Sequence, residues 1–148
     1  MNNEKVPQYL AELKSAAFDE ELNDNDILIT SDTVVILGNK ILEKPADRNE
    51  AIQMISQLAG NKHTVITAVC IRSNNKKESF ANHTKVTFSP MSQDEIEYYI
   101  DTCKPFDKAG SYGCQEWLGY VAIEKMEGSF YSVMGMPLHQ VYQALKAF

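Results

Sequence analysis

Apolar positions recur along this chain with two different periods, which predict helices in some segments and strands in others. Four segments carry apolar residues at the three- and four-residue spacing of an amphipathic helix. In the clearest one, Asp47 and Glu50 form a capping pattern, an apolar stripe follows from Ala51, and Gly60 provides the stop. The predicted helices are residues 7–20, 47–59, 92–103 and 137–145.

Shorter runs rich in valine, isoleucine and threonine predict strands, separated by turn residues such as Gly38 and Asn39. Helices and strands alternate, so the fold class is α/β, or α+β with a mixed sheet and flanking helices. Nothing along residues 1–148 resembles a linker or a repeat, which indicates a single domain. The predicted strands are residues 27–31, 33–37, 40–42, 65–71, 79–88 and 120–123.

Composition and charge exclude several classes of protein. No apolar run approaches the ~20 residues of a membrane-spanning helix, and the first residues lack the pattern of a signal peptide. The three widely spaced cysteines are typical of reduced thiols in the cytoplasm. A net charge of −6 argues against nucleic acid as a partner. A few lysines gathered in one cleft can still bind a small polyanion.

Asp32 is the most informative single residue. It separates two β-branched runs, so it is predicted to lie at a kink between two buried strands. A carboxylate is rarely buried unless it is paired, hydrogen-bonded or bound to a metal, which makes Asp32 a candidate site residue. The alternative is an Asx turn that caps the first strand.

Two further loops carry unusual combinations of residues near strand ends, where α/β sheets usually place their sites. One contains Lys44 before a proline, and the other, residues 107–115, combines two glycines with Lys108, Tyr112 and Gln115. The alternative for both is a turn with a solvated lysine. The histidines lack metal-ligand spacing and are interpreted as ordinary polar positions: His63, His83 and His139.

The order of these segments resembles that of a known family. The chain contains, in sequence, SDTVV, EKPAD, LAGNKHTVIT, KVTFSPMSQDEIEYYI, PFDKAGSYGCQEW and EGSFYSVMGMPL. Each piece is weak alone, but the combination over residues 9–145 resembles the Maf family, also called septum-formation inhibitor-like proteins. The resemblance implies a fold similar to the inosine-triphosphate pyrophosphatases. It also implies that a nucleoside triphosphate is cleaved between its α- and β-phosphates with a divalent cation, Mg²⁺ or Mn²⁺, by a homodimer.

The resemblance also assigns roles to individual residues. Asp32 matches the family's proton acceptor, and its part in binding the metal stays open. Thr33 and Gln115 match positions tied to substrate choice and resemble the branch that acts on dTTP and UTP, rather than the 7-methyl-GTP branch. Three lysines match family lysines and would contact phosphate: Lys14, Lys44 and Lys108.

One family segment has no counterpart here. Maf proteins open with a strand and a loop of the type S-x-S-P-R-R, followed by a helix, whereas Arg48 and Arg72 stand in other contexts. We therefore expect an N-terminally shortened member, without the first strand and helix, that hydrolyses nucleotides poorly. Two alternatives to a pyrimidine nucleotide pyrophosphatase stay open. One is a catalytically impaired nucleotide-binding or interaction module, and the other is a generic α/β domain whose three loops are only turns.

Overall fold

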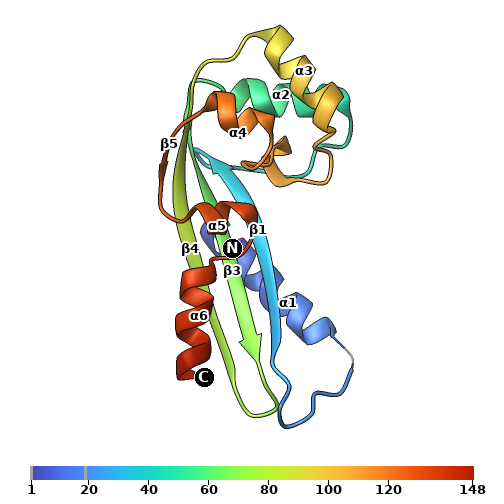
Figure 1. The fold of residues 1–148 in the computed structure, drawn as a ribbon. Helices are drawn as coiled ribbons and strands as arrows, with labels where there is room; N and C mark the ends of the chain where they lie inside the picture. Colours follow the sequence, from blue (N-terminus) through green and yellow to red (C-terminus); the bar gives the residue numbers. More distant parts are fainter. Residues whose placement is uncertain (1, 19) are drawn as a thin grey trace.

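A computed structural model of the chain describes residues 2–18 and 20–148 and contains a five-stranded sheet in the order β2-β1-β3-β4-β5 (Figure 1). The α/β class is confirmed, but every strand pair in the described residues is antiparallel, so the sheet is not mixed. Tight hairpins join β1 to β2 and β3 to β4, which dictates antiparallel pairing. The strands are β1 (Leu28–Leu37), β2 (Lys40–Leu42), β3 (Lys62–Arg72), β4 (Lys77–Phe88) and β5 (Ile123–Glu127).

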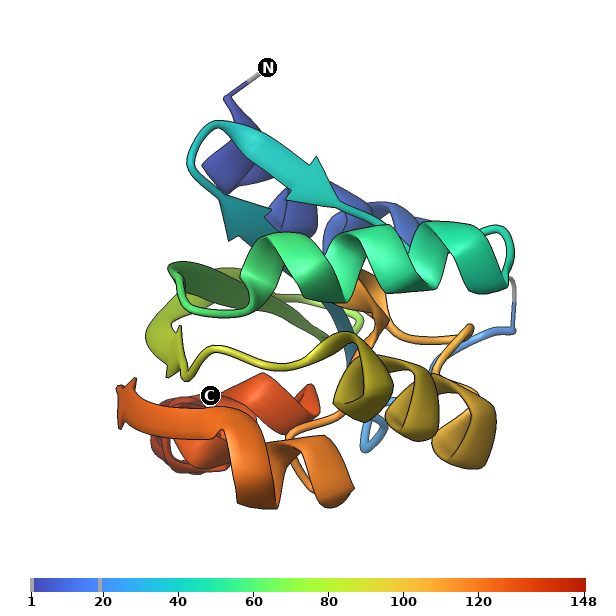
Figure 2. The same ribbon diagram turned by 90° about the horizontal axis from the view of Figure 1, so that it is seen from above.

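The helices cover both faces of this sheet. Helix α1 packs on one face, and α6 packs on the opposite face, as Figure 2 shows from above. Helices α2, α3 and α4 gather at one end of the long strands (Figure 1). The helical segments are η1 (Asn3–Lys5), α1 (Val6–Ala17), α2 (Arg48–Leu58), α3 (Gln93–Cys103), η2 (Ala109–Ser111), α4 (Trp117–Ala122), α5 (Phe130–Met134) and α6 (Leu138–Ala147).

The predicted helix starts are confirmed where a side chain caps the backbone. At α3, Ser92 Oγ accepts a hydrogen bond from the Glu95 amide at 3.2 Å, and the Glu95 carboxylate accepts one from the Ser92 amide at 2.9 Å. At α2, Asp47 Oδ1 accepts from the Glu50 amide at 2.8 Å. These bonds satisfy amides that the helix itself leaves without partners.

The prediction of a kink at Asp32 is wrong. β1 runs through this position without a break, and Asp32 pairs directly with Ala68 of β3. The Asx-turn alternative fails for the same reason. Thr30, Ser31 and Thr33 are tolerated in a strand because long-range pairing with β3 overrides the local polar signal.

Three other predictions need correction. Residues 120–122 end helix α4, and β5 begins only at Ile123; the five-residue α5 was not predicted. The apolar spacing of residues 137–145 indicates that Leu138 and Tyr142 face inward, but in α6 they are 51% and 60% exposed. The helix packs mainly through Val141 on the β3 residues Val69 and Ile71. The predicted helix over residues 7–20 ends at Ala17, and Asp19 in that range lies outside the described residues.

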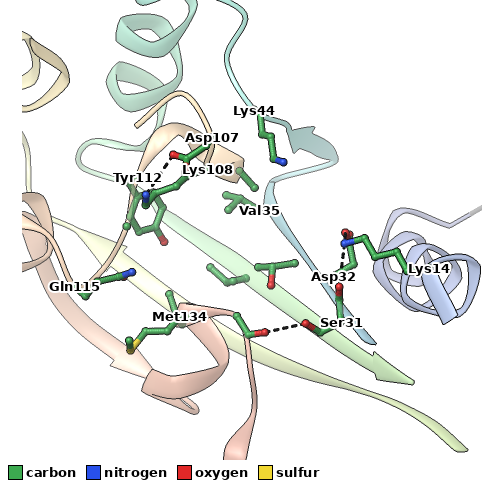
Figure 3. Close-up of a pocket in the computed structure, with 16 residues that line it drawn as sticks. Lys14, Ser31, Asp32, Val35, Lys44, Asp107, Lys108, Tyr112, Gln115 and Met134 are labelled. Carbon is green, nitrogen blue, oxygen red and sulfur yellow. Dashed lines mark hydrogen bonds and ion pairs between the residues drawn. The ribbon is translucent and has the colours of Figure 1, made fainter. Parts of the chain in front are cut away.

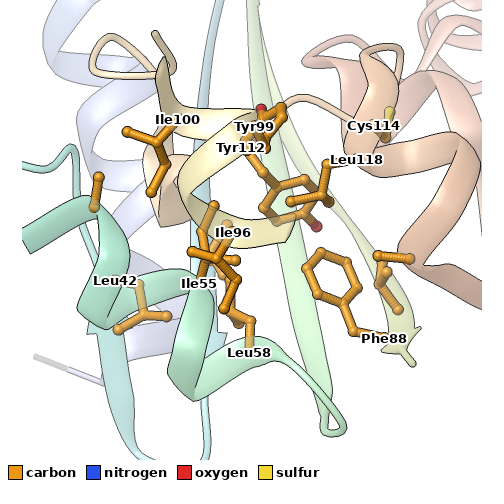
Figure 4. Close-up of a cluster of buried hydrophobic side chains, with 14 of the residues drawn as sticks. Leu42, Ile55, Leu58, Phe88, Ile96, Tyr99, Ile100, Tyr112, Cys114 and Leu118 are labelled. Atoms are coloured by element: carbon orange, nitrogen blue, oxygen red, sulfur yellow. The ribbon is translucent and has the colours of Figure 1, made fainter. Parts of the chain in front are cut away.

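The largest buried cluster joins α2, α3 and α4 to β3 and β4 and holds the 107–115 loop against them (Figure 4). Tyr99 and Tyr112 are buried within it. Tyr99 Oη accepts from the Gly113 amide at 3.1 Å and donates to Glu116 Oε1 at 2.7 Å. The loop is therefore fixed by packing and by its own hydrogen bonds, and it presents its exposed side to the sheet edge.

No helix within residues 2–18 and 20–148 combines the length and the apolar character needed to cross a membrane. None of the three cysteines forms a disulfide in the structure, and Cys70 and Cys114 are buried.

Gly110 sets how closely this loop approaches β1. Its φ of +68° lies in the left-handed region, and a Cβ at this position would lie 3.0 Å from Val35 Cγ2. We expect Gly110→Ala to lower the free energy of unfolding by about 2–3 kcal/mol, from backbone strain plus overpacking. Gly38→Ala is the matched control, because Gly38 has a φ of +61° with open space around the Cβ position. Equal midpoints for the two variants in urea denaturation would contradict a role for the Val35 contact.

Candidate active site

A cavity of about 330 Å³ lies at the edge of β1, where β2 stops (Figure 3). It is bounded by α1, β1, the segment after β2, the 107–115 loop and the end of α5. All six residues singled out from the sequence line it: Lys14, Asp32, Thr33, Lys44, Lys108 and Gln115.

The cavity reaches both faces of the sheet because it wraps around a strand edge. β2 pairs only with Val35, Ile36 and Leu37 of β1, and residues 28–34 have no second strand beside them in the described part of the chain. Successive side chains of a strand point to opposite faces. Asp32 therefore faces α1, whereas Thr33 faces α5, and both contact the same cavity.

Asp32 forms an ion pair with Lys14. Lys14 Nζ lies 2.8 Å from Asp32 Oδ1 and also donates to the Ser31 carbonyl at 3.0 Å. The Asp32 side chain is only 17% exposed, whereas that of Lys14 is 55% exposed. The carboxylate is therefore largely shielded from solvent but still open to the cavity.

Two contacts hold α1 where Lys14 can reach Asp32. Thr30 Oγ1 of β1 donates to the Ala11 carbonyl at 2.7 Å. At the end of the helix, the Arg72 guanidinium donates to Ser15 Oγ at 3.0 Å and to the Ser15 carbonyl at 3.1 Å. Arg72 thus has a structural role and is not among the residues that line the cavity.

The opposite wall carries two more lysines. Lys108 Nζ lies 3.3 Å from Asp107 Oδ1, and this hydrogen bond, with a smaller contribution from the charge of Lys44, lowers the pKa of the Asp107 carboxyl below its ordinary value. The lining has three lysines and two aspartates, so it carries a net positive charge in a protein with a net charge of −6. Such local focusing attracts a polyanion.

His63 is not an ordinary polar position, contrary to the sequence interpretation. It is 2% exposed, and its Nε2 lies 2.6 Å from Tyr112 Oη. Its ring also packs edge-on against Phe88, with the centroids 5.0 Å apart. Burial lowers the pKa of His63 to about 4, so the imidazole is neutral at pH 7. The pair fixes Tyr112, whose ring forms part of the cavity wall.

Sequence reasoning missed the wall formed by the end of α5. Val133, Met134 and Gly135 line the cavity, and strand hydroxyls hold this segment: Ser31 Oγ donates to the Gly135 carbonyl at 3.3 Å. Thr67 Oγ1 donates to the Ser132 carbonyl at 2.6 Å. The available signal was Thr67 itself, a polar residue within an otherwise apolar strand sequence.

The described residues contain no cluster of three or more histidine, cysteine, aspartate or glutamate side chains that could hold a metal ion. Mg²⁺ does not require such a cluster when a phosphate ligand is present, because one or two carboxylates then suffice. Lys14 contacts Asp32 Oδ1, so Asp32 Oδ2 can provide one oxygen from the cavity wall. The donor set therefore fits a cation that arrives with a polyphosphate.

Comparisons with known proteins identify the family. The family model for Maf-like proteins matches residues 1–148. The chain belongs to the Maf-like protein family. Among curated relatives, a dTTP/UTP pyrophosphatase of Porphyromonas gingivalis is 49% identical over all of this chain and 75% of its own length.

Two further relatives carry the same name. The Christiangramia forsetii protein is 48% identical over 99% of this chain and 74% of its own length. The Bacteroides fragilis protein is 42% identical over 99% of this chain and 76% of its own length. The Maf-like chain thus spans about three quarters of the length of each.

The buried His63 predicts a loss of stability in acid. Its pKa of about 4 in the folded protein is below the ordinary value of about 6.5, so the unfolded chain binds the proton first as the pH falls. The stability that depends on neutral His63 is complete above pH ~6.5 and is lost progressively toward pH ~4, by about 3 kcal/mol. His63→Gln, which cannot titrate, should lack this component in urea denaturation between pH 4 and pH 7. Parallel pH profiles for the two proteins would contradict the assignment.

Proposed function

We propose that this Maf-like chain hydrolyses dTTP and UTP to the nucleoside monophosphate and pyrophosphate. One observation carries the proposal: six residues from four separate segments, chosen from the sequence alone, line a single cavity. The name dTTP/UTP pyrophosphatase, which relatives 42–49% identical to this chain bear, supports the same activity. It favours an enzyme over a nucleotide-binding module without catalysis.

The two ends of the cavity differ in character, which suggests how a nucleotide lies in it. Figure 3 shows Gln115 and Met134 at one side and the Lys14–Asp32 pair at the other, with Lys44 above. The triphosphate suits the space between the three lysines, with Lys14 on one wall and Lys44 and Lys108 on the other. The base suits the side where apolar groups surround a single amide, because small-molecule sites combine apolar walls with few polar groups.

In this arrangement Asp32 serves as the general base for the attacking water. Its carboxylate accepts a proton as the water oxygen bonds to the α-phosphorus, and the bond from that phosphorus to the bridging oxygen breaks to release pyrophosphate. The ion pair with Lys14 holds the carboxylate in place. Lys14, Lys44 and Lys108 stabilise the negative charge that develops on the phosphoryl oxygens.

A divalent cation, Mg²⁺ or Mn²⁺, completes the proposal. When bound, it would neutralise phosphate charge and polarise the phosphoryl group. Asp32 is the residue of the cavity wall that we propose as its protein ligand. Reduced thiols fit a cytoplasmic location, and the homodimer implied by the family likeness stays a prediction.

Product analysis tests this function. With Mg²⁺, dTTP and UTP should yield equal amounts of monophosphate and pyrophosphate, and EDTA should stop the release. Asp32→Asn should lower turnover by ~10²–10⁴, because an amide has the shape of the carboxylate but accepts no proton. An unchanged melting temperature would show that the variant is folded. Release of diphosphate and orthophosphate, or an Asp32→Asn rate within a few-fold of the parent, would refute the mechanism.

Base and phosphate contacts should respond differently to substitution. Gln115→Ala removes an amide at the proposed base end, so kcat/KM for dTTP and UTP should fall by about tenfold or more, and that for a non-preferred nucleotide should change less. Lys108→Ala should instead lower kcat/KM for all nucleotides by a similar factor, because a phosphate contact carries no information about the base. A uniform loss in the Gln115 variant would exclude it from base selection.

A further inference from the structure

A relay of three groups connects the cavity wall at Thr33 to α5. Thr33 Oγ1 on β1 lies 2.8 Å from Thr67 Oγ1 on β3, directly across the strand pair. Thr67 Oγ1 lies 2.6 Å from the Ser132 carbonyl oxygen. Thr67 is 0% exposed, so bulk solvent cannot replace either of these hydrogen-bond partners of its hydroxyl.

The direction of the relay follows from the number of protons. A hydroxyl has one proton, and a carbonyl oxygen can only accept. At 2.6 Å from the Ser132 oxygen, Thr67 must donate its proton there, because two oxygens this close repel without one. Thr67 must therefore accept from Thr33. The Thr33 proton is used inside the protein, and only its lone pairs remain for a ligand.

Access to those lone pairs depends on Gly135. This residue has a φ of +118°, and a Cβ built on it would lie 3.9 Å from Thr33 Oγ1. The absence of a side chain leaves space above the hydroxyl, and both Thr33 and Gly135 line the cavity.

We propose that Thr67 is a positioning residue for base selection: it fixes the Thr33 hydroxyl as an acceptor and so selects a pyrimidine with an N3–H over one without. The inference rests on the proposed function. Uracil and thymine present an N3–H between two carbonyl oxygens, whereas N3 of cytosine is an acceptor. An acceptor facing an acceptor leaves both unpaired, which is the kind of mismatch that sites discriminate against.

Gln115 complements this pattern. Cys114 Sγ lies 3.6 Å from Gln115 Oε1, which occupies the amide oxygen and leaves the amide nitrogen toward the cavity (Figure 3). A donor at Gln115 and an acceptor at Thr33, both on the cavity wall, have the polarity that the carbonyl and N3–H of uracil or thymine require. The Gln115 amide can rotate to present its oxygen to cytosine. The Thr33 hydroxyl cannot change from acceptor to donor while Thr67 donates its proton to the Ser132 carbonyl.

Binding of α,β-methylene UTP and CTP by calorimetry tests the inference without requiring turnover. The parent should prefer the uridine analogue, and Thr67→Val should reduce that preference by about tenfold, because Thr33 is then free to donate to cytosine N3. Thr67→Ser should restore the preference. The parent should also bind the N3-methyluridine analogue at least about tenfold more weakly than the uridine analogue. This measurement uses only the parent protein and so does not depend on the folding of a variant.

Thr84→Val is the matched structural control. Thr84 is also 0% exposed on a strand, and its hydroxyl accepts from the Ser129 amide at 3.1 Å near the start of α5, but it does not touch Thr33. It should lose stability while retaining the preference. Three results would each overturn the inference and leave the proposed function intact. They are a retained preference for the uridine analogue in Thr67→Val, a loss of that preference in Thr84→Val equal to the loss in Thr67→Val, and full affinity of the parent for the N3-methyl analogue. Failure of the parent to bind any of the analogues would overturn the proposed function as well.

Discussion

The antiparallel pairing of β1 with β3 is the constraint on which the candidate site depends. Nine consecutive residue pairs, from Leu28–Arg72 to Ile36–Thr64, fix the register. A slip of one residue would send every side chain of β1 to the other face. Asp32 would then lose Lys14, and Thr33 would lose Thr67. Hydrophobic positions on both faces prevent that slip, since Val34 and Val35 are buried on opposite sides of the sheet.

The cavity wall formed by α5 depends on the same strands. A helix of five residues has too few internal hydrogen bonds to be stable alone. It is held instead by hydroxyl groups of three neighbouring strands: Ser31 on β1, Thr67 on β3 and Thr84 on β4. These bonds offset the cost of burying polar groups, and they place the wall relative to β1. The shape of the cavity therefore depends on the pairing of the strands that carry these hydroxyls.

The sequence predicted the parts of this structure that are encoded locally. The capped helices α2 and α3 and the hairpin at Gly38 have short-range signals, and the six cavity residues were found because their segments resemble a family pattern. The kink at Asp32 was predicted wrongly because local polarity carries no information on the β3 partner. Thr67 and the buried His63 were missed for a related reason: what each does is set by residues far away in sequence, Ser132 and Tyr112.

Two kinds of interaction surround the cavity: exposed charges, which act on affinity for a triphosphate, and buried neutral hydrogen bonds, which act on selectivity for a base. Lys14 and Lys44 are exposed, so their attraction for a triphosphate operates through solvent and is screened by salt. Thr67 is fully buried and His63 nearly so, and their hydrogen bonds lie where neither water nor salt competes. An acidic protein can therefore gather a polyanion with a few exposed cations. In the role that we propose for Thr67, the choice of base is instead made by the neutral Thr33–Thr67–Ser132 hydrogen bonds, whose donors and acceptors are fixed by the fold.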